Sequence, residues 1–116
     1  MLRLIEARRG EIAELCRQFH VRRLDVFGSA ARGFDFDPTR SDVDLLVTYE
    51  RDAPRPPLEE YFGFQERLEA LFGRSVDLVM AGAVRNPFVR ADIERSRELV
   101  YEARPAGVSL GRARGR

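Results

Sequence analysis

Two aspartates, Asp42 and Asp44, alternate with apolar residues at the start of the run DVDLLV. Because side chains alternate faces along a strand, we expect both carboxylates on one face, with Cα atoms roughly 6 to 7 Å apart. Two ionised carboxylates at that separation repel by about 2 kcal/mol at an effective dielectric of about 20. The chain contains no lysine, and the nearest arginines, Arg32 and Arg40, lie in the preceding loop. The pair therefore favours an added cation such as Mg²⁺, which usually binds one or two carboxylates plus the phosphates of a substrate.

A glycine-serine turn, Gly28 and Ser29, ends the apolar run that precedes these aspartates. Such a turn can hold a phosphate through backbone N–H groups, a hydroxyl and the start of a following helix. The segment GSAARG lacks the lysine of a Walker A motif, so it is not a P-loop of the NTPase kind. Arg32, at the end of this segment, either contacts phosphate or forms an ion pair with Asp35 or Asp37.

A third aspartate, Asp77, is the only charged residue in the apolar stretch SVDLVM. A carboxylate inside an apolar strand is costly unless a partner or a cation compensates it. Asp77 is therefore a candidate to join Asp42 and Asp44 at one site. The simpler alternative is a solvent-facing aspartate on an edge strand.

The length and composition restrict the class of protein. A chain of 116 residues forms one domain with a single core and has no room for a separate substrate domain. There is no apolar run long enough to span a bilayer and no apolar secretory segment at the N-terminus, so we expect a cytoplasmic protein without a membrane partner. Cys16 is the only cysteine, which excludes an internal disulfide and a cysteine-based zinc cluster.

The charge is distributed unevenly. All 19 acidic residues lie at or before Glu102, whereas four of the 20 arginines follow Ala103, so residues 1–103 carry 16 − 19 = −3 and the tail carries +4. A mildly acidic body argues against a folded nucleic-acid-binding surface, which is usually basic. The apolar pattern ends at Ala103, so we expect an ordered domain over 1–103 and a disordered Arg/Gly-rich tail over 104–116.

Hydrophobic spacing and turn residues predict the order of the elements. In chain order we expect a helix over 2–19, a strand over 21–27, a short helix ended by Gly33, a strand over 42–49, a helix over 58–72, a strand over 75–80, a helix over 86–96 and a closing strand over 99–101. Loop residues fill 34–41, and three prolines make 51–57 an exposed connection. This order predicts an α/β (α+β) fold, a mixed β-sheet with helices packed mainly on one face.

Taken together, the Gly28-Ser29 turn, the Asp42-Val43-Asp44 strand and the lone Asp77 resemble the polymerase-β-like nucleotidyltransferase superfamily. The closest resemblance is to its minimal nucleotidyltransferase (MNT) domains. It extends from Leu4 to Tyr101 and includes the local sequences FGSAARG, SDVDLLV and VDLVM. The loop before Asp42 is slightly longer than the family often shows. The resemblance implies a polymerase-β-like nucleotidyltransferase core over 1–103.

The resemblance also implies a role for each candidate residue. Gly28 and Ser29 would hold the β- and γ-phosphates of ATP. Asp42 and Asp44 would bind two Mg²⁺ ions, while Asp77 would complete the shell of the catalytic ion and help to deprotonate an attacking hydroxyl. Two metal ions can stabilise the attacking and leaving oxygens of an in-line displacement at phosphorus, so the residue types agree with the implied roles.

MNT domains of this size commonly act as antitoxins beside a HEPN-family toxin, which is a helical ribonuclease. The resemblance therefore implies an Mg²⁺-dependent protein adenylyltransferase that moves AMP from ATP to a tyrosine of its partner toxin. A domain confined to residues 1–103 has no added recognition domain, so a protein acceptor that brings its own binding surface suits it.

Two alternatives stay open at this point. The chain could be a non-catalytic antitoxin that neutralises its partner by binding alone, in which case loss of Asp42 and Asp44 would leave neutralisation intact. It could also transfer a nucleotide to a small hydroxylated molecule or to an RNA end, although such enzymes usually carry further domains.

Overall fold

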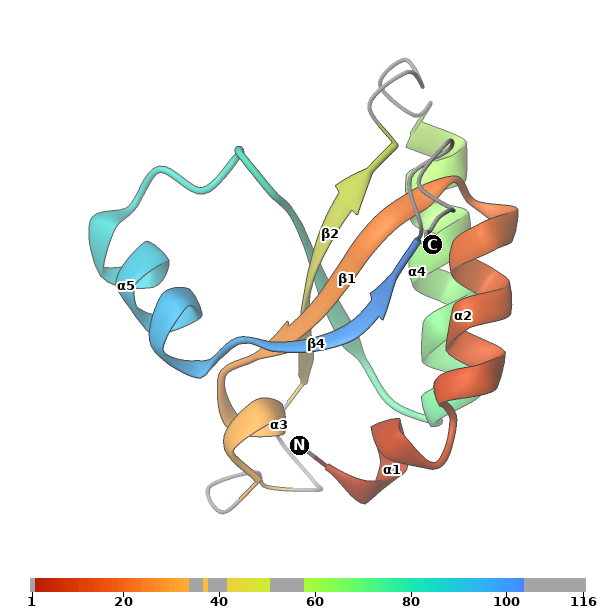
Figure 1. Ribbon diagram of the computed structural model, residues 1–116, viewed down its shortest axis with the longest axis horizontal. Coiled ribbons are helices and arrows are strands. Elements are labelled where there is room, and N and C mark those ends of the chain that lie inside the picture. The colour runs from red at the N-terminus through yellow and green to blue at the C-terminus, as the bar shows by residue number, and fades with distance from the viewer. Residues whose placement is uncertain (1, 34–36, 38–41, 51–57, 104–116) are drawn as a thin grey trace, which may run out of the picture.

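Four strands form one mixed sheet in the order β3-β2-β1-β4 (Figure 1). The computed structural model describes residues 2–33, 37, 42–50 and 58–103. Strand β1 (Val21–Phe27) pairs antiparallel with both β2 (Val43–Tyr49) and β4 (Glu98–Glu102). Strand β3 (Val76–Met80) pairs parallel with β2. The mixed sheet predicted from the sequence is confirmed.

Helices cover the two faces of this sheet unequally. Helices α2 (Arg9–Gln18) and α4 (Leu58–Phe72) lie side by side on one face, with the short α1 (Arg3–Glu6) at the end of α2 (Figure 1). Helix α5 (Pro87–Ser96) lies on the opposite side, away from α2 and α4 (Figure 1). The short α3 (Ser29–Arg32) directly follows β1. The prediction that helices pack mainly on one face is confirmed.

The core occupies the face beneath α2 and α4. Its fully buried side chains include Ile12 and Cys16 from α2, Phe64 and Leu68 from α4, and Leu24, Val26, Leu45 and Val47 from the central strands. A smaller buried cluster of Phe27, Leu46 and Ile93 joins the opposite face of the sheet to α5. Since strand side chains alternate, the residues between the core positions of β2, including Asp44, belong to the α5 face.

The N-terminal helix differs from the prediction of one continuous helix over 2–19. The chain forms α1 and α2 separately, with Arg8 in a non-helical conformation between them (φ −110°, ψ 12°). Gly10 weakens the helix at this point, because glycine costs about 1 kcal/mol relative to alanine in a helix interior. The Leu2 amide donates to the carbonyl of Ala30 in α3, so the first turn is directed toward α3 rather than along α2.

The other predicted elements agree closely with the structure. Helix α4 has the predicted bounds, and the side chain of Asn86 caps α5 by accepting from the Phe88 amide at 2.8 Å. Strand β4 extends one residue beyond the prediction at each end. Among the described helices, none is long and apolar enough to cross a membrane. The predictions for the loop over 34–41, apart from residue 37, for the connection over 51–57 and for the tail over 104–116 lie outside the described residues.

Candidate active site

Asp44 and Asp77 occupy the same register position on neighbouring parallel strands. Their flanking residues Val43, Leu45, Val76 and Leu78 are buried in the core, so both aspartates project from the α5 face. Adjacent strands lie about 4.8 Å apart, and paired residues share a face. The structure therefore brings together two of the three predicted carboxylates, although Asp77 is also exposed on an edge strand, as the simpler alternative expected.

Asp42 lies one position before the first residue of β2, whereas the sequence predicted it as the first residue of the strand over 42–49. Its side chain is exposed, and its negative charge acts on Asp44, whose pKa it raises. The strand begins at Val43, where the backbone amide donates to the Ser75 carbonyl at 3.0 Å. Asp42 thus lies at the solvent edge of the same acidic cluster.

Gly28 brings the turn after β1 against this cluster. Phe27 is the register partner of Asp44, so Gly28 comes directly after the paired position. A Cβ added at Gly28 would lie 2.8 Å from Asp44 Oδ2, which is closer than real Cβ atoms approach. Gly28 also has φ +68° and ψ −148°, a conformation that side chains other than glycine's rarely adopt. The predicted turn and the predicted aspartate are therefore in direct contact.

A hydrogen-bond relay that the sequence did not predict ties α5 to this turn. The Gly28 amide donates to Ser96 Oγ at 2.9 Å, and the Ser96 hydroxyl donates to the Asp92 carbonyl at 2.7 Å. The Asp92 carboxylate accepts from Arg32 at 3.4 Å. The Gly28 amide is therefore already hydrogen-bonded to Ser96, whereas Ser29, the other residue of the predicted turn, is partly exposed.

Arg32 lies within electrostatic reach of Asp44. Its positive charge opposes the upward shift in the pKa of that carboxyl. The structure pairs Arg32 with Asp92 of α5, a partner that the sequence did not suggest. Of the two loop partners that it did suggest, Asp35 lies outside the described residues. Arg32 therefore stands at the border between the glycine-serine turn and the carboxylates, where a phosphate contact would be needed.

The raised pKa of Asp44 shows that negative charge is concentrated around its carboxylate. Burial, and then the charges of Asp77, Asp42 and Asp92, raise the pKa of Asp44 from 3.8 to about 6. Each of these causes penalises the ionised form, since a partly buried carboxylate among like charges lacks compensation. Strongly perturbed carboxyls of this kind cluster at functional sites.

The donor set fits a magnesium ion shared with a phosphate ligand. Within the described ranges, no three Asp, Glu, His or Cys side chains form a group that could hold a metal ion by themselves. Mg²⁺ does not need such a cage, because it usually keeps several waters and takes one or two carboxylates plus substrate phosphates. Asp44 and Asp77 offer hard oxygen ligands on adjacent strands, and a divalent cation would relieve the repulsion that raises the pKa of Asp44.

Two side chains of α4 hold the strand that carries Asp77. Gln65 Nε2 donates to the Val76 carbonyl at 2.8 Å, and the Tyr61 hydroxyl donates to the Leu78 carbonyl. These carbonyls lie on either side of Asp77 along β3, which is an edge strand. Because unpaired backbone groups on an edge are otherwise solvated or available to other strands, α4 both satisfies them and fixes the position of Asp77.

Asp25 is a further carboxylate on this face that sequence reasoning missed. It is fully buried and accepts from Arg23 Nε at 3.0 Å and from Arg97 at 2.7 Å. The two arginines come from β1 and from the residue that ends α5. Asp25 therefore anchors the end of α5 to the sheet. Its carboxylate is paired with the two arginines and is not available to a ligand.

The fold and the candidate site together define the class of protein. The chain is an α+β domain in which the sheet face toward α5 carries clustered carboxylates beside a glycine-serine turn. Nucleotide-dependent transfer requires such an arrangement. Residues 10–100 match the family model described as "Nucleotidyltransferase domain". The chain belongs to this nucleotidyltransferase family.

Known relatives agree with this assignment. A protein adenylyltransferase, MntA of Thermococcus cleftensis, is 40% identical over 88 residues, which are 76% of this chain and 81% of that protein. A solved structure provisionally described as a minimal nucleotidyltransferase has a TM-score of 0.63 at 33% identity, over 80% of this chain and 89% of the other. An MNT antitoxin in complex with tri-AMPylated Shewanella oneidensis HEPN toxin gives a structure with a TM-score of 0.60 at 15% identity, over 85% of this chain and 73% of that one, and shares the fold.

Proposed function

We propose that the chain transfers AMP from ATP, with Mg²⁺, to a tyrosine of a HEPN-family toxin and thereby acts as its antitoxin. The relative that is 40% identical is named a protein adenylyltransferase, which supports AMP as the transferred group. The structural relative that contains an AMPylated HEPN toxin supports a toxin of that family as the acceptor. The single observation that carries the proposal is the pairing of Asp44 with Asp77 beside Gly28.

The chain's own residues would divide the work as follows. Ser29, with Arg32 beside it, binds the terminal phosphates, and the carboxylates of Asp42, Asp44 and Asp77 hold the magnesium ions. When bound, Mg²⁺ stabilises the charge that develops on the attacking and leaving oxygens. The tyrosine oxygen forms a bond to the α-phosphorus as the bond from that phosphorus to pyrophosphate breaks. Asp77, which is exposed, would accept the phenolic proton.

Labelled ATP tests the transfer directly. The chain, Mg²⁺ and the co-encoded partner protein are incubated with ATP that carries the label on its α-phosphate, and the partner should acquire the label. Asp42→Asn combined with Asp44→Asn should remove it. Glu66→Gln, an exposed acid of α4 on the far side of the sheet, serves as the matched control and should leave labelling unchanged. Label transfer that survives the double change would refute the carboxylate assignment.

A growth assay separates catalysis from simple binding. In cells that produce the toxin, the chain should restore growth, whereas the Asp42/Asp44 double variant should not. Restored growth with the double variant, together with an unlabelled toxin, would show that neutralisation is stoichiometric and would replace the enzymatic proposal.

A further inference from the structure

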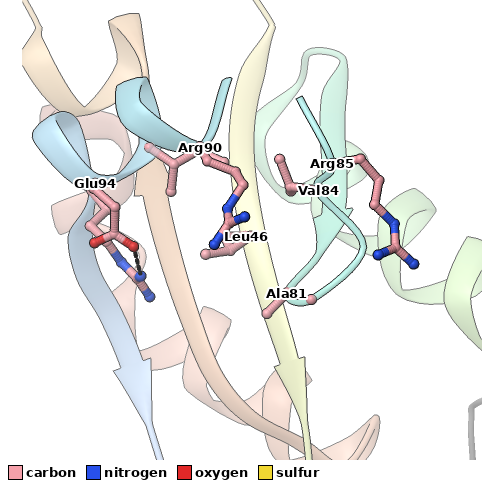
Figure 2. A pocket seen from close by; sticks show the side chains of 9 residues that line it. Leu46, Ala81, Val84, Arg85, Arg90 and Glu94 are labelled. Atoms are coloured by element: carbon pink, nitrogen blue, oxygen red, sulfur yellow. Dashed lines mark hydrogen bonds and ion pairs between the residues drawn. The ribbon is translucent and has the colours of Figure 1, made fainter. Parts of the chain in front are cut away.

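A pocket of about 540 Å³ lies between α5 and the sheet, on the face that carries the aspartates. Leu46 of β2 and Ile93 of α5 form its apolar part, and Ala81 and Val84 line it after the end of β3. Arg90 and Arg97 supply its charged walls. Figure 2 shows Arg90 extending from α5 toward Leu46, while Arg85 points away from both. The volume lies within the range of about 300 to 1,000 Å³ that is usual for small-molecule sites.

The strand register places this pocket in line with the proposed active site. Leu46 is two positions after Asp44 on the same face of β2, roughly 7 Å further along the strand. On β1, the partner of Asp44 is Phe27 and the partner of Leu46 is Asp25. Gly28 and Ser29 follow Phe27 and so lie at the opposite end of this row from Leu46. The order across the sheet face is glycine-serine turn, carboxylates, pocket.

This order matches the order of groups in a nucleoside triphosphate. Terminal phosphates at Ser29 and an α-phosphate at Asp44 leave the sugar and base to extend toward Leu46. The distance of roughly 7 Å between the two strand positions suits a group attached directly to the α-phosphate. A protein acceptor, by contrast, would approach from solvent and would not need a pocket of this size beside the carboxylates.

The lining suits an aromatic heterocycle with polar edges. Leu46 and Ile93 are buried and offer an apolar surface, while the guanidinium of Arg90 can stack on an aromatic face. Neither Arg85 nor Arg90 forms an ion pair with a described residue, so stacking by Arg90 would displace no such partner. Glu94 adds a hydrogen-bond acceptor at the wall.

Buried Asp25 keeps one wall of the pocket fixed. Arg97 donates to Asp25 at 2.7 Å and to Glu94 at 3.3 Å, so its guanidinium is held from two sides. The pocket wall is therefore preformed rather than assembled around a ligand, which lowers the entropic cost of binding.

We propose that this pocket binds the nucleoside, base and ribose, of the nucleoside triphosphate. The proposal rests on the proposed nucleotidyl transfer and deepens it by assigning the residues that recognise the nucleoside. It assigns Arg90 as a specificity-determining residue.

Calorimetric titration with two probes tests this assignment. One probe is α,β-methylene-ATP, which cannot transfer AMP, and the other is inorganic tripolyphosphate, which lacks the nucleoside; both are titrated with Mg²⁺ present. Ala81→Trp fills the pocket and should weaken binding of the ATP analogue at least tenfold while leaving tripolyphosphate unchanged. Ala91→Trp, on an exposed α5 residue outside the pocket lining, is the matched control and should bind both probes as the original chain does.

A second variant keeps the test decisive if Ala81→Trp does not fold. Arg90→Ala removes an exposed side chain and should weaken the ATP analogue at least threefold without affecting tripolyphosphate. Unchanged binding of the ATP analogue in both variants would overturn the nucleoside assignment while leaving nucleotidyl transfer intact. Equal weakening of both probes would also overturn it, because the pocket would then act on phosphate. An original chain that binds neither probe would overturn the proposed function together with this subsite.

Discussion

The carboxylate of Asp44 lies against the backbone of Gly28, so closely that a Cβ at residue 28 would stand 2.8 Å from Asp44 Oδ2. Two separate features therefore require glycine at this position: the contact with Asp44 and the backbone φ of +68°. The same contact joins the turn proposed to bind phosphate to the strand proposed to bind metal, so a change at either residue is expected to affect both.

Gly28→Ala should destabilise the fold by about 1 to 3 kcal/mol and reduce AMP transfer at least tenfold, because it strains the backbone and displaces Asp44. Gly73→Ala provides the control, since Gly73 has φ +69° but no atom within 4 Å of an added Cβ. Gly73→Ala should destabilise the chain by about 1 kcal/mol and leave transfer unchanged. Equal loss of transfer in the two variants would show that backbone strain, not contact with Asp44, matters.

Without divalent cations, the stability of the chain should depend on pH through Asp44. Its pKa rises from 3.8 to about 6 on folding, so the folded state binds the proton more tightly than the unfolded state. This favourable contribution is complete below pH 3.8 and is lost as the pH rises through about 6. Asn at residue 44 cannot ionise and does not undergo this loss, so the Asp44→Asn variant should gain stability relative to the original chain over this interval.

Urea unfolding at a series of pH values measures this effect. The informative quantity is the difference in the free energy of unfolding between Asp44→Asn and the original chain, because other titrating groups contribute equally to both. The difference should grow between pH 3.8 and about 6 and then level off. A difference that is independent of pH would contradict the environment described for Asp44.

Magnesium should stabilise the chain only while Asp44 is present. A ligand at one hundred times its dissociation constant stabilises the folded state by about 2.7 kcal/mol, which raises the melting temperature. We expect Mg²⁺ with tripolyphosphate to produce this rise in the original chain, and Asp44→Asn to show little of it. Removal of the metal with EDTA should abolish AMP transfer. Transfer that persists in EDTA would exclude the magnesium assignment.

Asp25→Asn should be among the most destabilising single changes in the chain. The substitution leaves Arg23 and Arg97 without their buried counter-charge, and breaking a buried ion pair costs about 3 to 5 kcal/mol. Glu11→Gln breaks an exposed pair with Arg8 and should cost about 0 to 1 kcal/mol. Chemical denaturation of the two variants compares these values. A small effect at Asp25 would mean that α5 is held mainly by Ile93 and its neighbours.

Much of the fold, and the spacing of the candidate site residues, could be predicted because these features are local in sequence. Alternation in DVDLLV and VDLVM placed Asp44 and Asp77 within strands, and the apolar periodicity of 58–72 gave the bounds of α4. The start of the helix predicted over 86–96 lies within one residue of the start of α5 for the same reason, since the cap that Asn86 provides depends on a few adjacent residues.

The features that were missed depend on contacts between distant segments. Ser96 binds the amide of Gly28, which is 68 residues away in sequence, and no local pattern indicates that pairing. Asp25 carried the same signal as Asp77, an acid inside an apolar strand, but its burial depends on Arg97, which is 72 residues away. The break between α1 and α2 likewise reflects the bond between Leu2 and Ala30.

The parallel pairing of β2 with β3 also has a consequence for folding. Residues 44 and 77 belong to strands connected through α4, and parallel strands can pair only after such a crossover closes. A ribosome-bound fragment that ends before β3 lacks Asp77, one of the two carboxylates proposed to bind metal. A single proteolytic cut in the crossover removes the covalent link between the two strands. The chain should therefore become able to bind nucleotide only late in synthesis, when the sheet is complete. Nucleotide binding should also indicate that the chain is intact.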